Sequence, residues 1–157
     1  RWQADTLIST IRWPLWEWYC DIPKDIMSAI KSLRNAPIDV DYHPETLSSP
    51  AHWIYEPDES ISYHRLLLRS NFSTGSKGYW TEANSIRSPQ ADAVRFHNEF
   101  AYPINTLGKP EAVEKILAWG RDNGIIGMGR WGRWEHMNSD VAVEHAMEVA
   151  LCVAKKN

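Results

Sequence analysis

The sequence of 157 residues contains only two cysteines, Cys20 and Cys152, which lie far apart and outside any Cys-x-x-Cys pattern. This scarcity excludes a disulfide framework and a zinc ribbon, and it favours a reducing compartment, which we take to be the cytoplasm. Long apolar runs are lacking as well. The longest, residues 146–154, is interrupted by Glu148 and is much shorter than the about 20 residues that a membrane span requires. We therefore expect a soluble protein with no membrane partner.

Positive charge is also scarce, because 17 Lys and Arg residues stand against 20 Asp and Glu residues and the net charge is −3. A chain with this balance has no basic field to gather nucleic acid, so we expect no nucleic-acid partner. Tryptophan, by contrast, is abundant, with nine Trp beside six Tyr and three Phe. Trp joins an apolar body to a polar N–H and often lines a surface for a cofactor, a sugar or a partner. The Trp-rich amino end, with Trp13, Trp16 and Trp18, is a candidate partner surface.

Hydrophobic patterning predicts an α+β chain. Alternating or β-rich runs indicate strands over residues 4–11, 38–42, 53–55, 61–69, 79–82, 94–100 and 125–126. Apolar residues at helical spacing predict three helices, over residues 23–34, from Pro110 to the glycines at 120 and 124, and after a cap at 138–140. The apolar stripe of the last helix comprises Val143, Met147, Ala150, Leu151 and Ala154. We expect the middle strands to form a mixed or antiparallel sheet.

The strongest local signal is the glycine-rich segment 127–134, which follows a predicted strand and leads to the start of the last helix. Glycine lets the backbone approach a ligand, and the free N–H groups of a helix start present partial positive charge. The pattern is typical of a turn that contacts an anion or a flavin, to which Arg130 or Arg133 could add a bidentate contact. The alternative is an ordinary tight turn in which Trp131 and Trp134 only pack.

Four segments, in this order along the chain, resemble the carboxyl-terminal portion of UDP-galactopyranose mutases and related FAD-dependent proteins of the amine-oxidase type. They are ADTLIST at residues 4–10, Tyr63-His64-Arg65 followed by SNFS at 70–73, Tyr102-Pro103, and GRWGRWEHMNSD at 129–140. The resemblance implies a substrate-domain sheet with three helices, and a last strand and helix that complete a Rossmann-like FAD domain.

The resemblance also divides the chain. It implies a strand and connection from the FAD domain over 1–20, a substrate-binding sheet region with one helix over 21–106, and a helix, strand, glycine loop and final helix of the FAD domain over 107–157. The GxGxxG turn that holds FAD in these flavoproteins has no counterpart in the sequence. We therefore expect Arg1 to begin part of a longer polypeptide, whose amino-terminal FAD-binding half is the missing partner.

The resemblance further implies roles for individual residues. It places Gly129, Arg130, Asn138, Ser139 and Asp140 at FAD, and Arg65, Asn71, Tyr102 and His136 at the substrate, with Arg65 and Arg130 catalytic. From the residues alone, Arg65 among leucines could equally be an outward charge on a strand. Phe72 and His136 stand where the mutases have Tyr, so two phenolic donors to a diphosphate are changed.

The implied reaction is the redox-neutral ring contraction of a nucleotide-sugar with reduced FAD as the nucleophile, which makes the chain part of an isomerase. The changed donors leave open an oxidoreductase that oxidises an amine or another small substrate. A third alternative is a non-catalytic carbohydrate-binding sheet that uses Trp80, Trp131 and Trp134, although a strand residue such as Trp80 is more often core. We expect no metal, because His136, Asp140 and Glu144 lack a fourth ligand.

Overall fold

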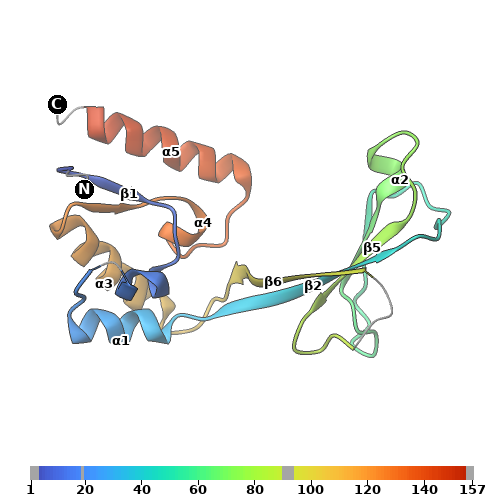
Figure 1. Ribbon diagram of the computed structural model, residues 1–157, viewed down its shortest axis with the longest axis horizontal. Helices are drawn as coiled ribbons and strands as arrows, with labels where there is room; N and C mark the ends of the chain where they lie inside the picture. Colours follow the sequence, from blue (N-terminus) through green and yellow to red (C-terminus); the bar gives the residue numbers. More distant parts are fainter. Residues whose placement is uncertain (1–3, 19, 90–93, 155–157) are drawn as a thin grey trace. The chain divides into compact units, whose positions relative to one another are not determined.

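The computed structural model describes residues 4–18, 20–89 and 94–154, and the chain divides into two compact units (Figure 1). The first, which we call the terminal unit, combines residues up to Arg34 with residues from Pro103 onward. The second, the sheet unit, comprises residues 35–102. The predicted α+β class with an antiparallel sheet and several helices is confirmed.

The terminal unit contains two short strands and most of the helices. In chain order its elements are β1 (Leu7–Ser9), the 3-10 helix η1 (Trp13–Trp18), α1 (Lys24–Ser32), α3 (Lys109–Asp122), β7 (Ile125–Gly127), α4 (Gly129–Gly132) and α5 (Ser139–Ala154). Strands β1 and β7 pair in parallel, with Leu7 opposite Ile125 and Ser9 opposite Gly127. The chain therefore brings its amino-terminal strand beside the strand that leads into the glycine loop.

The core of the terminal unit lies between η1, α1 and α3. It contains the buried residues Trp13, Trp16, Ile26, Ile30, Leu33, Ala112, Ile116, Ile125 and Trp134. Helix α1, which the sequence groups with the sheet region, packs on α3 in this core. The indole rings of Trp13 and Trp16 stack at 5.6 Å. These two residues are therefore core, and of the three tryptophans in η1 only Trp18 is exposed.

Prolines mark the starts of two helices, α1 and α3. Pro110 lies in the first turn of α3, where its missing N–H costs nothing. Helix α1 begins after Pro23, and no side chain of the described residues caps it. One-turn helices α2 and α4 were not predicted, because four residues are too few to show a helical period.

The sheet unit is a five-stranded sheet with the order β3-β4-β5-β2-β6. Its elements are β2 (Asn35–His43), β3 (Trp53–Tyr55), β4 (Arg65–Leu68), the one-turn helix α2 (Arg69–Phe72), β5 (Tyr79–Asn84) and β6 (Val94–Pro103). The pairs β3–β4, β4–β5 and β2–β5 run antiparallel. The predicted strand over 61–69 is shorter in the structure, because a turn closes between Asp58 and Ile61 and α2 begins at Arg69.

The register gives the sheet two different faces. On one face Leu66, Leu68 and Ala83 are buried together with Asp39 and Asp41. The other, which we call the open face, carries the row in which Arg65 lies opposite Tyr55 and Glu82. Among the described residues, no helix is long and apolar enough to cross a membrane.

Candidate functional site

Two glycines of the segment 127–134 have a packing role. A Cβ at Gly127 would collide with the backbone of Gly132, and a Cβ at Gly132 would collide with the carbonyl oxygen of Ser9. The indole Nε1 of Trp13 donates a hydrogen bond to the Gly132 carbonyl at 2.9 Å. For these two positions the tight-turn interpretation is correct, because β1, β7 and α4 approach one another through bare backbone.

Gly129 differs from its two neighbours. Its φ is +69°, a backbone conformation that residues with a Cβ rarely adopt. Apart from its two chain neighbours and the backbone of its own helical turn, no atom of the described residues lies within 4 Å of the position that a Cβ would occupy. The loop therefore leaves the backbone at Gly129 open to its surroundings, which is the property that contact with a flat ligand requires.

Arg130 links the glycine loop to the segment that precedes α5. Its Nη2 donates to the carbonyl oxygen of Met137 at 2.7 Å, and Met137 is buried. Asn138, Ser139 and Asp140 then expose the start of α5, and the Asn138 carbonyl accepts the Ala142 N–H. The exposed His136 lines an open hollow of about 340 Å³ with Met137 and Asn138. The structure thus brings the five residues predicted for FAD to one end of α5, and His136 lies beside them.

Trp134 is a core residue. Its side chain is 1% exposed, its φ is +51°, and its ring packs edge-on against Trp131 with centroids 5.1 Å apart. Both tryptophans belong to the terminal unit, whereas Trp80 belongs to the sheet unit. Trp134 therefore does not belong to the predicted sugar-binding surface of Trp80, Trp131 and Trp134, since a buried indole offers no face to a ligand.

On the open face of the sheet, the buried carboxylate of Glu82 lies within hydrogen-bond distance of three other side chains. Glu82, which is 5% exposed, accepts a hydrogen bond from Arg65 Nη2 through Oε2. Its Oε1 lies 3.2 Å from His64 Nε2 and 3.5 Å from the Tyr102 hydroxyl. The guanidinium of Arg65 also lies 5.9 Å from the centre of the Tyr55 ring. The two predicted residues Arg65 and Tyr102 are thus brought together, 3.5 Å apart between Nη2 and the hydroxyl.

Glu82 determines the electrostatics of this cluster. Burial opposes the charge of Arg65, but the hydrogen bond to Glu82 and the charge of that carboxylate raise the pKa of Arg65 above its ordinary value. Arg65 therefore stays cationic and is neutralised by its partner. The sequence analysis does not single out Glu82. The available signal was an acidic residue inside a predicted strand, between Thr81 and Ala83.

Asn71 lies in α2, directly after β4, and binds the backbone of the segment before β3. Its Nδ2 donates to the carbonyl oxygens of Ser49 and Ala51, both at 2.7 Å, and so ties α2 to the segment before β3. Phe72 packs beside His52 and Trp53 on the same edge. The structure gives Asn71 a structural task, and its predicted contact with substrate stays a prediction.

A second polar cluster lies on the buried face of the sheet. Arg95 pairs with Asp41 through Nε at 2.7 Å and with Asp39 at 3.2 Å. Asp39 also accepts hydrogen bonds from His97 Nδ1 at 2.7 Å and from Ser85 at 2.9 Å. Although burial alone would raise it, these hydrogen bonds and Arg95 together lower the pKa of Asp39. No group of three or more His, Cys, Asp or Glu within the described ranges is arranged to hold a metal ion.

Comparison with known proteins gives a likeness of fold. No protein-family model matches the sequence, and no curated protein matches it either. Among solved structures, the crystal structure of reduced UDP-galactopyranose mutase is similar, with a TM-score of 0.67 and 18% sequence identity. The likeness covers 83% of this chain and 36% of that chain. The chain therefore spans about a third of the length of the protein that it matches.

Proposed function

We propose that this chain is the carboxyl-terminal part of an FAD-dependent enzyme similar to UDP-galactopyranose mutase, which acts on a nucleotide-sugar. The observation that carries the proposal is the fold shared with that mutase over 83% of the chain. The ordered motifs agree with it, because the glycine loop precedes α5 and Arg65 lies beside Tyr102 on the sheet.

The residues at the start of α5 fit a flavin. The backbone at Gly129 is open, and the first N–H groups of a helix have no carbonyl partner within it. Asn138, Ser139 and Asp140 are exposed there, so these N–H groups can receive the polar edge of a ring and favour negative charge on it. Arg130 braces the loop through Met137. When bound, the flavin supplies the nucleophilic or hydride-transferring chemistry.

On the sheet, the proposed role of the residues is to orient substrate. Glu82 fixes the guanidinium of Arg65, and the Tyr102 hydroxyl lies within 3.5 Å of both groups. Because the carboxylate compensates the cation, Arg65 acts as an oriented hydrogen-bond donor to substrate oxygens rather than as a free positive charge. This neutralisation also favours the second candidate, an oxidoreductase of the amine-oxidase type, whose substrate carries no diphosphate.

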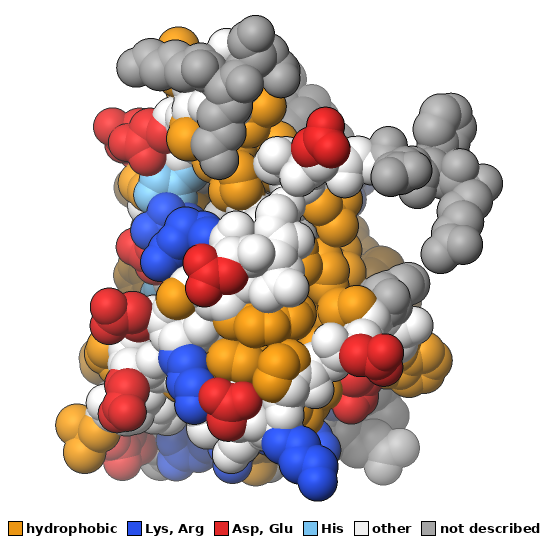
Figure 2. All heavy atoms as spheres, turned by 90° about the vertical axis from the view of Figure 1, so that its left-hand side faces the viewer, with side chains coloured by type: hydrophobic (Ala, Val, Ile, Leu, Met, Phe, Trp, Pro, Cys, Tyr) orange, Lys and Arg blue, Asp and Glu red, His pale blue; other side chains and the backbone are white. Residues whose placement is uncertain are grey.

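The proposed partner is an amino-terminal FAD-binding part, and α5 supports it. The predicted apolar stripe faces away from the terminal unit, with Val143 59%, Met147 63% and Leu151 63% exposed. The opposite side, including Val141 and Ala146, is only half-buried. Helix α5 thus carries apolar side chains on both its outer and its inner side, interrupted by Glu144, His145 and Glu148. Apolar residues on more than one side are typical of a helix enclosed by protein on several sides. Figure 2 shows that hydrophobic side chains also gather in the middle of the side of the terminal unit that lies on the left in Figure 1.

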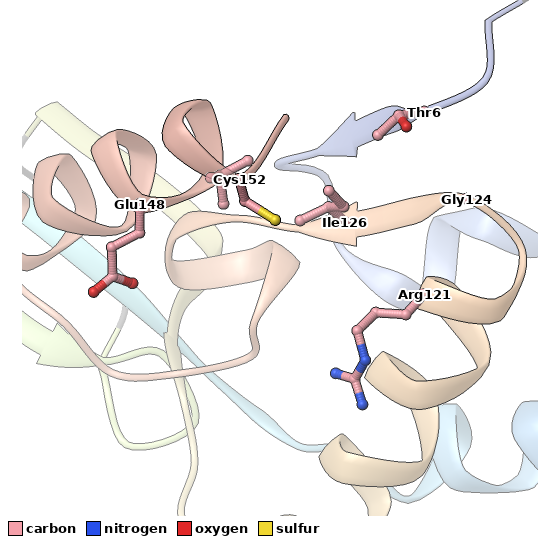
Figure 3. Close-up of a pocket in the computed structure, with 7 residues that line it drawn as sticks. Thr6, Arg121, Gly124, Ile126, Glu148 and Cys152 are labelled. Atoms are coloured by element: carbon pink, nitrogen blue, oxygen red, sulfur yellow. The ribbon is translucent and has the colours of Figure 1, made fainter. Parts of the chain in front are cut away.

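The inner side of α5 is also incompletely packed. A cavity of about 290 Å³ lies between α5, β7 and the end of α3, with Ile126 and Cys152 facing each other across it (Figure 3). Strands β1 and β7 form a parallel pair, and Leu7 and Ile8 on β1 are exposed. Parallel sheets are normally larger and covered on both faces. These features support a partner that adds strands and encloses α5.

The proposal is tested by visible absorption. We expect the chain alone to be colourless, because it lacks a phosphate-cradling turn, and to acquire a flavin spectrum when it is joined to the amino-terminal part of a UDP-galactopyranose mutase. Conversion of UDP-galactopyranose by the yellow hybrid would support the mutase, and oxidation of an amine would support the second candidate. A hybrid that folds but stays colourless contradicts both.

A further inference from the structure

One row of the open face consists almost entirely of aromatic side chains. Trp53 lies opposite Leu67, Leu67 opposite Trp80, and Trp80 opposite Tyr42. The Trp80 ring contacts those of Tyr42 and Phe96, with centroids at 5.0 and 5.5 Å. We call these five residues the aromatic row. It crosses β3, β4, β5, β2 and β6 in their spatial order.

The aromatic row is accessible rather than part of a core. Its end members Trp53 and Phe96 are 53% and 56% exposed, and the three residues between them are partly exposed. The apolar core of the sheet unit lies on the opposite face, where Leu66, Leu68 and Ala83 are buried. Because large exposed rings in a continuous row are unusual on a protein surface, they indicate a ligand surface.

The neighbouring row of the same face is polar. Two residues along the strands, which is about 7 Å, Tyr55 lies opposite Arg65 and Arg65 opposite Glu82. A pyranose ring has the matching two-sided chemistry, since its C–H face stacks on aromatic rings while its hydroxyl groups at the rim exchange hydrogen bonds. Apolar area with a few convergent polar groups is the general composition of a small-molecule site.

The charge of the sheet unit excludes an anionic polymer. Residues 35–102 include nine acidic and five basic side chains, and Arg65 on the open face is already paired with Glu82. Single-stranded nucleic acid also stacks on aromatic platforms, but it needs a basic groove to track its backbone. A polymer that lies along the aromatic row is therefore uncharged.

The length of the row sets the size of the ligand. Five strands at about 4.8 Å spacing give a row of about 19 Å, which is longer than a single sugar ring. We infer that the open face binds an uncharged linear oligosaccharide of several hexoses, whose rings lie along the aromatic row and whose hydroxyl groups reach Tyr55 and Arg65. This binding goes beyond the proposed flavin chemistry and uses only the sheet unit.

The test is saturation-transfer NMR on the intact chain with malto-, cello- and β-galacto-tetraose, methyl galactoside and UDP-galactose as probes. We expect one tetraose to bind at least tenfold more tightly than methyl galactoside or UDP-galactose. Trp53→Ala should weaken it at least fivefold, and Trp53→Tyr should restore most of the affinity by restoring a ring. Trp18→Ala is the matched control, because Trp18 is 78% exposed in the terminal unit.

Phe96→Ala provides a second variant at the other end of the row, should Trp53→Ala fail to fold. The inference is overturned if no tetraose binds at millimolar concentration, or if both alanine variants retain full affinity. It is also overturned if UDP-galactose binds the row more tightly than every tetraose. The flavin hybrid is not needed for this experiment. Binding of UDP-galactose to the chain would support the proposed nucleotide-sugar substrate and overturn only the oligosaccharide inference, so the two failures are distinguishable.

Discussion

Arg65 and Glu82 lie directly opposite each other on β4 and β5, and the guanidinium of the first donates to the buried carboxylate of the second. Such a pair is costly to break one-sidedly, because the remaining charge loses its partner while it stays out of water. This relationship gives the clearest energetic prediction for the sheet unit.

We expect Arg65→Leu to lower the free energy of unfolding by about 3 kcal/mol, since it strands the Glu82 carboxylate. The double variant Arg65→Leu, Glu82→Leu should recover much of that loss, because no charge is left unpaired. Urea denaturation monitored by amide signals of β4 and β5 measures both. Additive losses would show that the two side chains do not act as a pair.

Arg65→Ala in the flavin hybrid should weaken UDP-galactose by about 2 kcal/mol, the scale of one charge-assisted hydrogen bond. Flavin content should not change, because the role proposed for Arg65 is to contact the substrate. Titration of substrate and the visible spectrum provide the two readouts. A parallel loss of flavin and substrate would make Arg65 structural.

The stability of the sheet unit should fall in acid through Asp39. The pKa of Asp39 is lowered in the folded chain, so its contribution is complete above the unfolded value of about 4 and is lost as the pH falls below it. Asp39→Asn should cost about 2 kcal/mol at neutral pH and flatten this acid dependence. Glu59→Gln, at an exposed position, is the control for urea midpoints measured between pH 3 and 7.

Substitutions in the glycine loop should separate backbone strain from packing. Gly129→Ala should cost about 1 kcal/mol, because it places a Cβ at positive φ in open space. Gly132→Ala should cost considerably more, since its Cβ meets the backbone of Ser9. Thermal unfolding of the two variants makes the comparison. Equal losses would contradict the close approach of β1 and α4.

The outward apolar stripe of α5 should contribute to association with the amino-terminal FAD-binding part and not to the stability of the chain alone. Met147→Glu should change the stability of the chain alone by no more than about 0.5 kcal/mol, because Met147 is exposed there. The same change should prevent the hybrid from acquiring its flavin spectrum, since it places a charge in the proposed contact. Glu144→Gln on the same helix is the matched control. A yellow Met147→Glu hybrid would remove α5 from the contact surface.

The sequence predicts those features that depend on local pattern. Isoleucines at helical spacing and a proline at the first turn place α1 and α3, and alternation in residues 38–42 places β2. Features that depend on a partner far along the chain escape it. Glu82 becomes important only through the register of β4 and β5. Trp134 becomes core only because it belongs to one cluster with residues as distant in sequence as Trp13. The stripe of α5 has the right period, but a period does not tell which side meets the protein.

The division of the chain has a consequence for the order of folding during synthesis. The terminal unit is discontinuous, and its contact between Trp13 and Gly132 spans 119 positions. The sheet unit is continuous and has emerged in full before the second part of the terminal unit is made. Since contacts distant in sequence form slowly and domains fold as units from the amino end, we expect the sheet unit to fold first. The residues before the sheet unit then lack their packing partners, and Trp13 stays exposed to solvent until the segment around Gly132 has been synthesised.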